Sequence, residues 1–89
     1  MRLKEGFRLR PLGREFILTA EDTRLVNFNR MIALNASAAF LWRSAAGKDF
    51  TSADLADMLV NEYGIDMDRA LADSEAIVAK WSESGLIQQ

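Results

Sequence analysis

Residues 31–42 read MIALNASAAFLW, and this stretch contains the change from strand to helix on which the fold depends. Its first four residues, Met31–Leu34, form an uninterrupted apolar run of strand length. Asn35 follows, and its side-chain oxygen can accept a hydrogen bond from the unpaired amides of a first helical turn. Residues 36–46 are rich in alanine and almost entirely apolar, and Gly47 is a natural left-handed stop. We therefore predict a short strand that leads directly into a mostly buried helix.

The residues before this stretch have the pattern of antiparallel strands. Phe7–Leu12 alternates apolar and polar residues, and Glu15–Ala20 is built largely of residues that favour strands. Leu25–Phe28 is a third run, and a two-residue turn is expected to separate it from Met31–Leu34. Pro11 cannot donate a ladder hydrogen bond, so it should lie on a sheet edge or at the end of its strand. We expect three or four short antiparallel strands.

The residues after Gly47 predict two more helices. Thr51 can cap a helix over residues 52–63, with Asp54 three residues later in a variant of the capping box. Asp66 is expected to cap a longer helix, in which apolar residues recur every three or four positions.

Together these patterns predict one α+β domain over residues 1–89. Its strands are expected at about residues 7–34 and its helices at about residues 36–46, 52–63 and 67–84. A small antiparallel sheet followed by three helices, the last one long, is the outline of a winged helix-turn-helix-like domain.

Composition excludes several classes of protein. The chain has 89 residues, no cysteine, no histidine and one proline. A chain of this length has a thin core, and it cannot form disulfides or the usual zinc, copper and iron sites. No apolar run approaches the ~18 residues of a membrane span, and the first residues do not resemble a signal peptide. We expect a cytoplasmic protein with no membrane segment, metal or cofactor.

Charge differs between the two parts of the chain. Residues 1–34 carry seven basic and four acidic residues, a net charge of +3, while residues 35–89 carry four basic and nine acidic residues, a net charge of −5. The helix that would enter a DNA groove has two cations, Arg69 and Lys80, against five acids. We therefore expect no nucleic-acid partner, and we keep a winged-helix DNA-binding transcriptional module as the alternative function.

Carboxylates are the strongest catalytic groups that this composition leaves. Asp54 and Asp57 lie near the start of one predicted helix, and Asp66 and Asp68 near the start of the next. The helix dipole favours negative charge at these places, so the pairs are interpreted as helix-start residues and not as a catalytic pair. We predict that the protein is not an enzyme and has no catalytic residues.

The apolar strand Met31–Leu34 is the strongest candidate for a binding element. An exposed strand edge presents unpaired amides and carbonyls, and a peptide can add to it as a further strand. The same edge could instead pair with itself in a homodimer, which stays open at this point. Trp81, at the end of the apolar stripe of the last helix, either lines a groove or closes the core.

Several joined motifs resemble the PqqD family, which contains the small proteins of pyrroloquinoline quinone synthesis and their relatives in peptide modification. Residues 34–42, LNASAAFLW, resemble the family pattern at the start of its first helix. The likeness continues through YGID at residues 63–66 to SGLI at residues 84–87, and it covers about residues 28–87.

The resemblance implies a function that composition does not indicate. Members of the family are RiPP recognition elements, where a RiPP is a ribosomally made and later modified peptide. They are non-catalytic, and they bind the leader of a precursor peptide and present it to a modifying enzyme, often a radical SAM protein. The leader adds as an antiparallel strand beside the third helix. Quinone synthesis itself is not implied.

Carried over to this chain, the resemblance assigns two groups of peptide-binding residues. The strand that pairs with the leader is formed by Met31, Ile32, Ala33 and Leu34. The wall of the groove is drawn from the apolar positions of the last helix, which are Ala70, Leu71, Ser74, Ile77, Val78 and Trp81.

Overall fold

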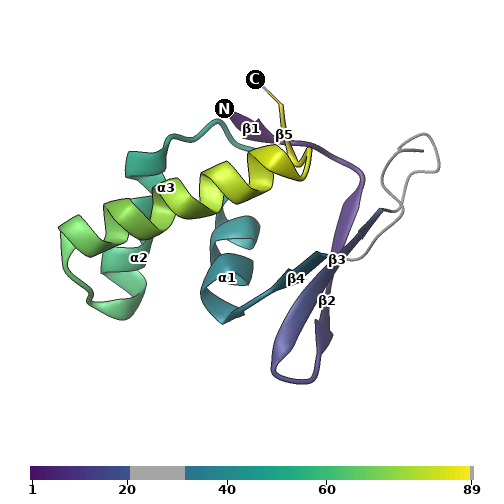
Figure 1. Ribbon diagram of the computed structural model, residues 1–89, viewed down its shortest axis with the longest axis horizontal. Helices are drawn as coiled ribbons and strands as arrows, with labels where there is room; N and C mark the ends of the chain where they lie inside the picture. Colours follow the sequence, from purple (N-terminus) through teal and green to yellow (C-terminus); the bar gives the residue numbers. More distant parts are fainter. Residues whose placement is uncertain (21–31, 89) are drawn as a thin grey trace.

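The computed structural model describes residues 1–20 and 32–88, which form a small sheet followed by three helices (Figure 1). The elements in chain order are β1 (Arg2–Leu3), β2 (Phe7–Leu12), β3 (Glu15–Ala20), β4 (Ile32–Leu34), α1 (Ala36–Ala45), α2 (Ser52–Tyr63), α3 (Met67–Glu83) and β5 (Ile87–Gln88). The predicted α+β class is confirmed, and each predicted helix matches the observed one to within one residue at either end.

The main sheet has three antiparallel strands in the order β2-β3-β4. Its register places Phe16 of β3 opposite Leu34 of β4 and Pro11 of β2 opposite the same Phe16. Pro11 thus lies on an edge strand of the described sheet, as predicted. The run predicted at residues 25–28, the turn after it and Met31 all lie outside the described residues.

A second sheet, which the sequence did not predict, joins the two ends of the chain. β1 pairs with β5, with Leu3 opposite Ile87, and the Lys4 amide donates to the Leu86 carbonyl at 2.8 Å. Strands of two residues are too short for periodicity to reveal. Leu86 and Ile87 are both buried, so this segment closes one end of the core.

Two of the three predicted helix caps are observed. The Asn35 side-chain oxygen accepts from the Ala38 amide at 2.9 Å, so strand β4 passes into α1 through a capped turn. Thr51 and Asp54 form the reciprocal capping box at the start of α2. The third cap is a correction: Asp66 has the extended backbone of an N-cap residue, but its side chain makes no capping hydrogen bond. Its exposed carboxylate can be solvated by water and still lies near the positive end of the α3 dipole.

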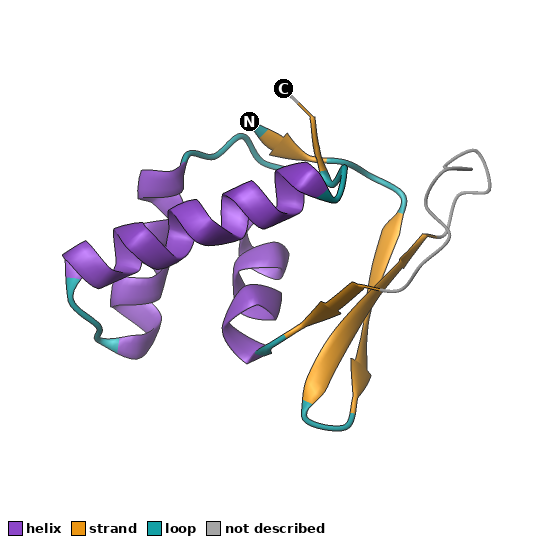
Figure 2. Ribbon diagram, viewed as in Figure 1, coloured by secondary structure: helices purple, strands orange, loops and turns teal. Residues whose placement is uncertain are grey.

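Figure 2 shows the three helices beside the small sheet, and the hydrophobic core draws buried side chains from all three helices and from the strands. Trp42 of α1 and Trp81 of α3 meet edge to face, with ring centroids 5.4 Å apart, and Phe7 of β2 approaches Trp42 in the same way at 6.2 Å. Trp42 is 6% exposed, in agreement with the mostly buried helix that the sequence predicts. Leu18 and Leu34 supply the inner face of the sheet. Burial of these side chains holds β4 against the helices.

Across the part of the chain that the structure describes, no helix combines the length and the apolar character that crossing a bilayer requires.

Candidate functional site

Strand β4 is an edge of the main sheet. Among residues 1–20 and 32–88, β3 is the only strand that pairs with it. Leu34 is buried and Ile32 half-buried, whereas Ala33 is exposed, so the apolar side chains face the core and a methyl group faces outward. Consecutive backbone amides of a strand point to opposite edges, so at least one amide of β4 points away from β3. A second backbone could pair with this edge.

A small cavity lies beside this edge, between β4, the start of α1 and the last turns of α3. Its volume is about 120 Å³. The residues that line it are Ala33, Leu34, Asn35, Ala38, Ile77, Lys80 and Trp81. The structure therefore brings the predicted strand and part of the predicted helix wall together at one place. A cavity of this size suits a backbone and a small side chain.

Trp81 has both of the roles that the sequence left open. Its side chain is 1% exposed and packs edge to face against Trp42, which makes it a core residue. It also lines the cavity beside β4. One face of a large aromatic ring can close the core while its edge borders a groove.

The other predicted wall residues lie at different depths. Ala70 and Ser74 are fully buried, and the Ser74 hydroxyl has no hydrogen-bond partner among the described residues. Leu71, Ile77 and Val78 are half-buried and pack against the core. Ile77 lines two of the described cavities; Ala70, Leu71, Ser74 and Val78 line none of them. Their part in peptide binding stays a prediction.

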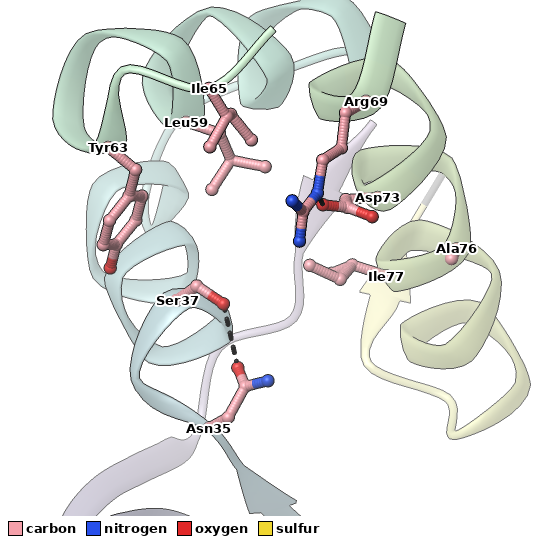
Figure 3. Close-up of a pocket in the computed structure, with 9 residues that line it drawn as sticks. All are labelled: Asn35, Ser37, Leu59, Tyr63, Ile65, Arg69, Asp73, Ala76 and Ile77. Atoms are coloured by element: carbon pink, nitrogen blue, oxygen red, sulfur yellow. Dashed lines mark hydrogen bonds and ion pairs between the residues drawn. The ribbon is translucent and has the colours of Figure 1, made fainter.

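A larger cavity of about 470 Å³ adjoins the small one (Figure 3). We name it the α2–α3 pocket. It is lined by Asn35, Ser37, Leu59, Tyr63, Ile65, Arg69, Asp73, Ala76 and Ile77. Figure 3 shows Leu59, Tyr63 and Ile65 on one side, with Arg69 and Ile77 pointing toward them from α3. Asn35 and Ile77 line both cavities, so the two are neighbours that share a wall.

Sequence reasoning missed most of this pocket. Tyr63, the last residue of α2, has a side chain that is 47% exposed. Sequence reasoning treated Arg69 and Lys80 only as weak evidence about DNA. The overlooked signal is their spacing, since residues 11 apart fall on nearly the same face of a helix. Arg69 lines the larger cavity and Lys80 lines the smaller one.

Acidic residues do not form a metal-binding cluster in the described part of the chain. Residues 1–20 and 32–88 contain no group of three or more carboxylates placed to hold a metal ion. Asp54 is engaged in the capping box, and Asp73 lies 3.6 Å from the Nε of Arg69.

A small α+β domain with an open sheet edge beside a long C-terminal helix is the class that these observations define. The sequence profile of the family named "Coenzyme PQQ synthesis protein D (PqqD)" matches residues 15–87. The chain belongs to this family. The match begins with β3, earlier than the motifs identified from the sequence.

Two solved structures share the fold. "Lasso peptide synthetase B1 complexed with the leader peptide" has a TM-score of 0.72 and 22% identity, and the alignment covers 99% of this chain and 96% of that one. "TbiB1 in Complex with the TbiA(beta) Leader Peptide" has a TM-score of 0.74 and 15% identity, with 99% and 95% covered. No curated protein matches the chain.

Proposed function

We propose that this protein is a non-catalytic adaptor that binds the leader of a ribosomally made precursor peptide and presents it to a modifying enzyme. The observation that carries this function is the edge of β4, which lies open among the described residues beside a groove lined by α3. In this proposal the backbone of residues 31–34 pairs with the leader, and Ile77 and Trp81 form the nearest part of the wall. Both solved neighbours are complexes with a leader peptide, which is consistent with this proposal.

The physical basis is strand addition. Main-chain hydrogen bonds provide affinity, and the neighbouring cavities select side chains. A short peptide that becomes ordered on one edge can supply about −8 kcal/mol, a Kd near 1 μM. The small exposed side chain of Ala33 lets a peptide backbone approach closely.

DNA binding is the disfavoured alternative. α3 carries Arg69 and Lys80 against Asp68, Asp73, Glu75 and Glu83, and Arg69 is near Asp73. Facing phosphates, this helix would present more repulsion than attraction.

From the family resemblance we expect the modifying enzyme to be of the radical SAM type. The two structural neighbours have other names: one is called a lasso peptide synthetase and the other TbiB1. A short peptide gene and a radical SAM gene beside this gene would favour a radical SAM partner.

Because the leader is made on ribosomes, we place the binding of the leader to this protein in the cytoplasm. A homodimer through β4 would compete with the leader, and sedimentation at low concentration separates a dimer from an open edge.

Amide hydrogen exchange of the protein, measured with and without peptides selected from a random phage-displayed library, tests the function. A selected peptide should bind near 1 μM and slow exchange of the outward amides in β4, because these amides become hydrogen-bonded. The outer amides of β2, the opposite edge of the same described sheet, are the internal control and should not change. Peptides that bind without protecting β4 would contradict strand addition.

A further inference from the structure

The main sheet has an outer face, which we define as the side of β2, β3 and β4 that points away from the buried Leu18 and Leu34. We propose that this face forms a size-selective subsite for one residue of the leader, the residue that lies opposite Ala33. That residue should carry a large apolar side chain, which lies over Ala33 and contacts Ile17. This inference rests on the proposed function and specifies a residue of the peptide that the site selects.

Strand register identifies the residues of the outer face. Successive side chains of a strand point to opposite faces, so Ile17 and Ala33 lie on the face opposite to Leu18 and Leu34. Ala33 of β4 is the partner of Ile17, and Arg10 of β2 is its partner on the other side. Arg10, Ile17 and Ala33 therefore form one row across the sheet, and the row ends at the edge of β4.

Ile17 offers apolar surface that the core does not use. Its chain neighbour Phe16 is one of the half-buried residues that pack against the core, whereas Ile17, also half-buried, is not one of them within the described ranges. Phe16 lies on the inner face, where Arg43 of α1 places its Cζ 5.2 Å from the ring centroid. The exposed part of Ile17 is therefore available to a ligand on the outer face.

The small side chain of Ala33 leaves space between Ile17 and an added strand. Ala33 is exposed, and it lies on an edge strand of the described sheet. Neighbouring strands lie about 4.8 Å apart, so the backbone of a leader residue opposite Ala33 would be roughly 10 Å from that of Ile17. Aromatic and other long side chains reach beyond the directly opposite residue, whereas small ones do not. A large leader side chain can therefore cross the methyl group and contact Ile17.

Strand addition places side chains on both faces of the sheet. Residues opposite each other on paired strands point to the same face, so the leader residue opposite Ala33 points outward. Its neighbours point inward, toward the cavity of about 120 Å³ that suits a small side chain. The gain from apolar contact is proportional to the area removed from water. We therefore expect a large outward residue between smaller inward ones.

The experiment uses the full chain and the peptides selected from the random phage-displayed library. Each residue of a selected peptide is replaced with alanine, and affinities are measured by fluorescence anisotropy with labelled synthetic peptides. A large apolar residue should recur at one position of the segment that protects β4. Its replacement with alanine should weaken binding by about tenfold, which corresponds to about 1.4 kcal/mol.

Two protein variants locate this contact on the outer face. Ile17→Thr keeps a β-branched residue in β3 and removes apolar surface. It should weaken the selected peptide by about threefold to tenfold and leave the alanine peptide almost unchanged, as a double-mutant cycle requires for direct contact. Ala33→Leu fills the space over residue 33, so it should weaken the selected peptide by about tenfold. It should bind the alanine peptide more tightly than the selected one, which reverses the preference of wild type.

The matched controls are Leu12→Thr and Ala53→Leu. Leu12 is 60% exposed on the outer face of β2, one strand further from the leader than Ile17, and Ala53 is exposed on α2. Both variants should stay within about twofold of wild type for both peptides. Thermal melting verifies that each variant is folded, and hydrogen exchange verifies that each bound peptide still protects β4.

The outcomes separate the two proposals. Selected peptides that protect β4 but bind Ile17→Thr and Ala33→Leu with wild-type affinity would overturn the outer-face subsite and leave strand addition intact. An equal loss for the selected and the alanine peptide in both variants would also overturn the subsite, because the variants would then act on backbone pairing. Failure to select any peptide that protects β4 would overturn both proposals.

Discussion

The two edges of the main sheet, β2 and β4, present the same backbone groups with very different side chains. β2 is six residues long and carries Arg8, Arg10 and Pro11, all exposed. β4 is three residues long and uncharged, and it lies beside a groove. Proline and charged side chains protect an edge from unwanted pairing, because one removes a donor and the other resists desolvation.

The difference teaches how one small sheet can be closed to pairing on one side and open on the other. On β2, the exposed Arg10 and Pro11 discourage a pairing strand. β4 has no such protection among its described residues, and it is short enough to limit aggregation by length alone. A partner that also fills the neighbouring cavities gains apolar contacts that β2 cannot offer. Changes at either edge test this comparison.

Trp81→Ala is expected to have the largest effect. It removes a buried ring that joins the β4 groove to the core, so the free energy of unfolding should fall by about 3–5 kcal/mol and peptide binding should be lost. Phe7→Ala on the β2 side removes a half-buried ring, and should cost less stability and spare binding in the folded protein. Chemical denaturation and anisotropy measure both. Equal losses of binding would contradict the distinction between the edges.

Ala33→Pro should reduce peptide affinity by about tenfold to a hundredfold, because it removes an amide and leaves a carbonyl partner unsatisfied, at about 1–3 kcal/mol. This loss is expected if the amide points outward, and thermal stability then stays near wild type; if the amide points to β3, stability falls and the outward donors remain. Ala33→Ser keeps the amide and is the control, with affinity expected within about threefold of wild type. Wild-type affinity in an Ala33→Pro variant that also keeps wild-type stability would rule out pairing at this edge.

Asn35→Ala should lower the free energy of unfolding by about 1 kcal/mol, since the α1 cap is lost. Affinity should fall too, because Asn35 borders both cavities. Thr51→Ala removes the cap of α2 at a similar cost in stability but lies away from the groove. An equal effect of the two substitutions on binding would mean that Asn35 acts only through stability.

Ser74→Ala should raise the free energy of unfolding by about 0.5–2 kcal/mol. The buried hydroxyl has no partner among the described residues, and alanine is the better helix former. Unchanged peptide affinity would assign Ser74 to the core behind the groove, and a loss of affinity would assign it to the wall. A loss of stability would show that the hydroxyl is satisfied in solution.

Pro11→Thr is expected to have the smallest effect. It returns an amide to the β2 edge, so weak self-association should appear in sedimentation velocity at high concentration. The added amide should contribute less than about 1 kcal/mol to the free energy of association. Arg8 and Arg10 still oppose pairing, which is why the change is small. Strong dimerisation of wild-type protein through β4 instead would favour the homodimer over the open edge.

Local patterns predicted the elements well. The helices follow from Asn35, Thr51 and glycine stops, because caps and apolar spacing are decided by residues within one or two turns. Asp66 shows the limit of such reasoning, since a favourable residue type at a cap position need not make the capping bond. The β1–β5 pair was missed because its energy comes from partners at opposite ends of the chain.

The candidate site was predicted in part. Apolar spacing placed Ile77 and Trp81 on one stripe of the last helix, and the family resemblance implied that this stripe lies beside the strand. The structure puts both residues at the cavity that Ala33 and Leu34 also line. Apolar spacing did not separate residues of the groove wall from residues of the core, because Ser74 and Trp81 share one stripe and differ only in what packs against them.

The sequence by itself determined the α+β order of elements, the limits of the helices and the lack of thiol and imidazole chemistry, because these depend on residue types and their local spacing. Tertiary structure alone decided that β2 and β4 are the edges of the described sheet, and that Arg69, Tyr63 and Ile77 surround one pocket. The physical reason is that edges and cavities are created by contacts between residues far apart in the chain, which short-range periodicity does not encode.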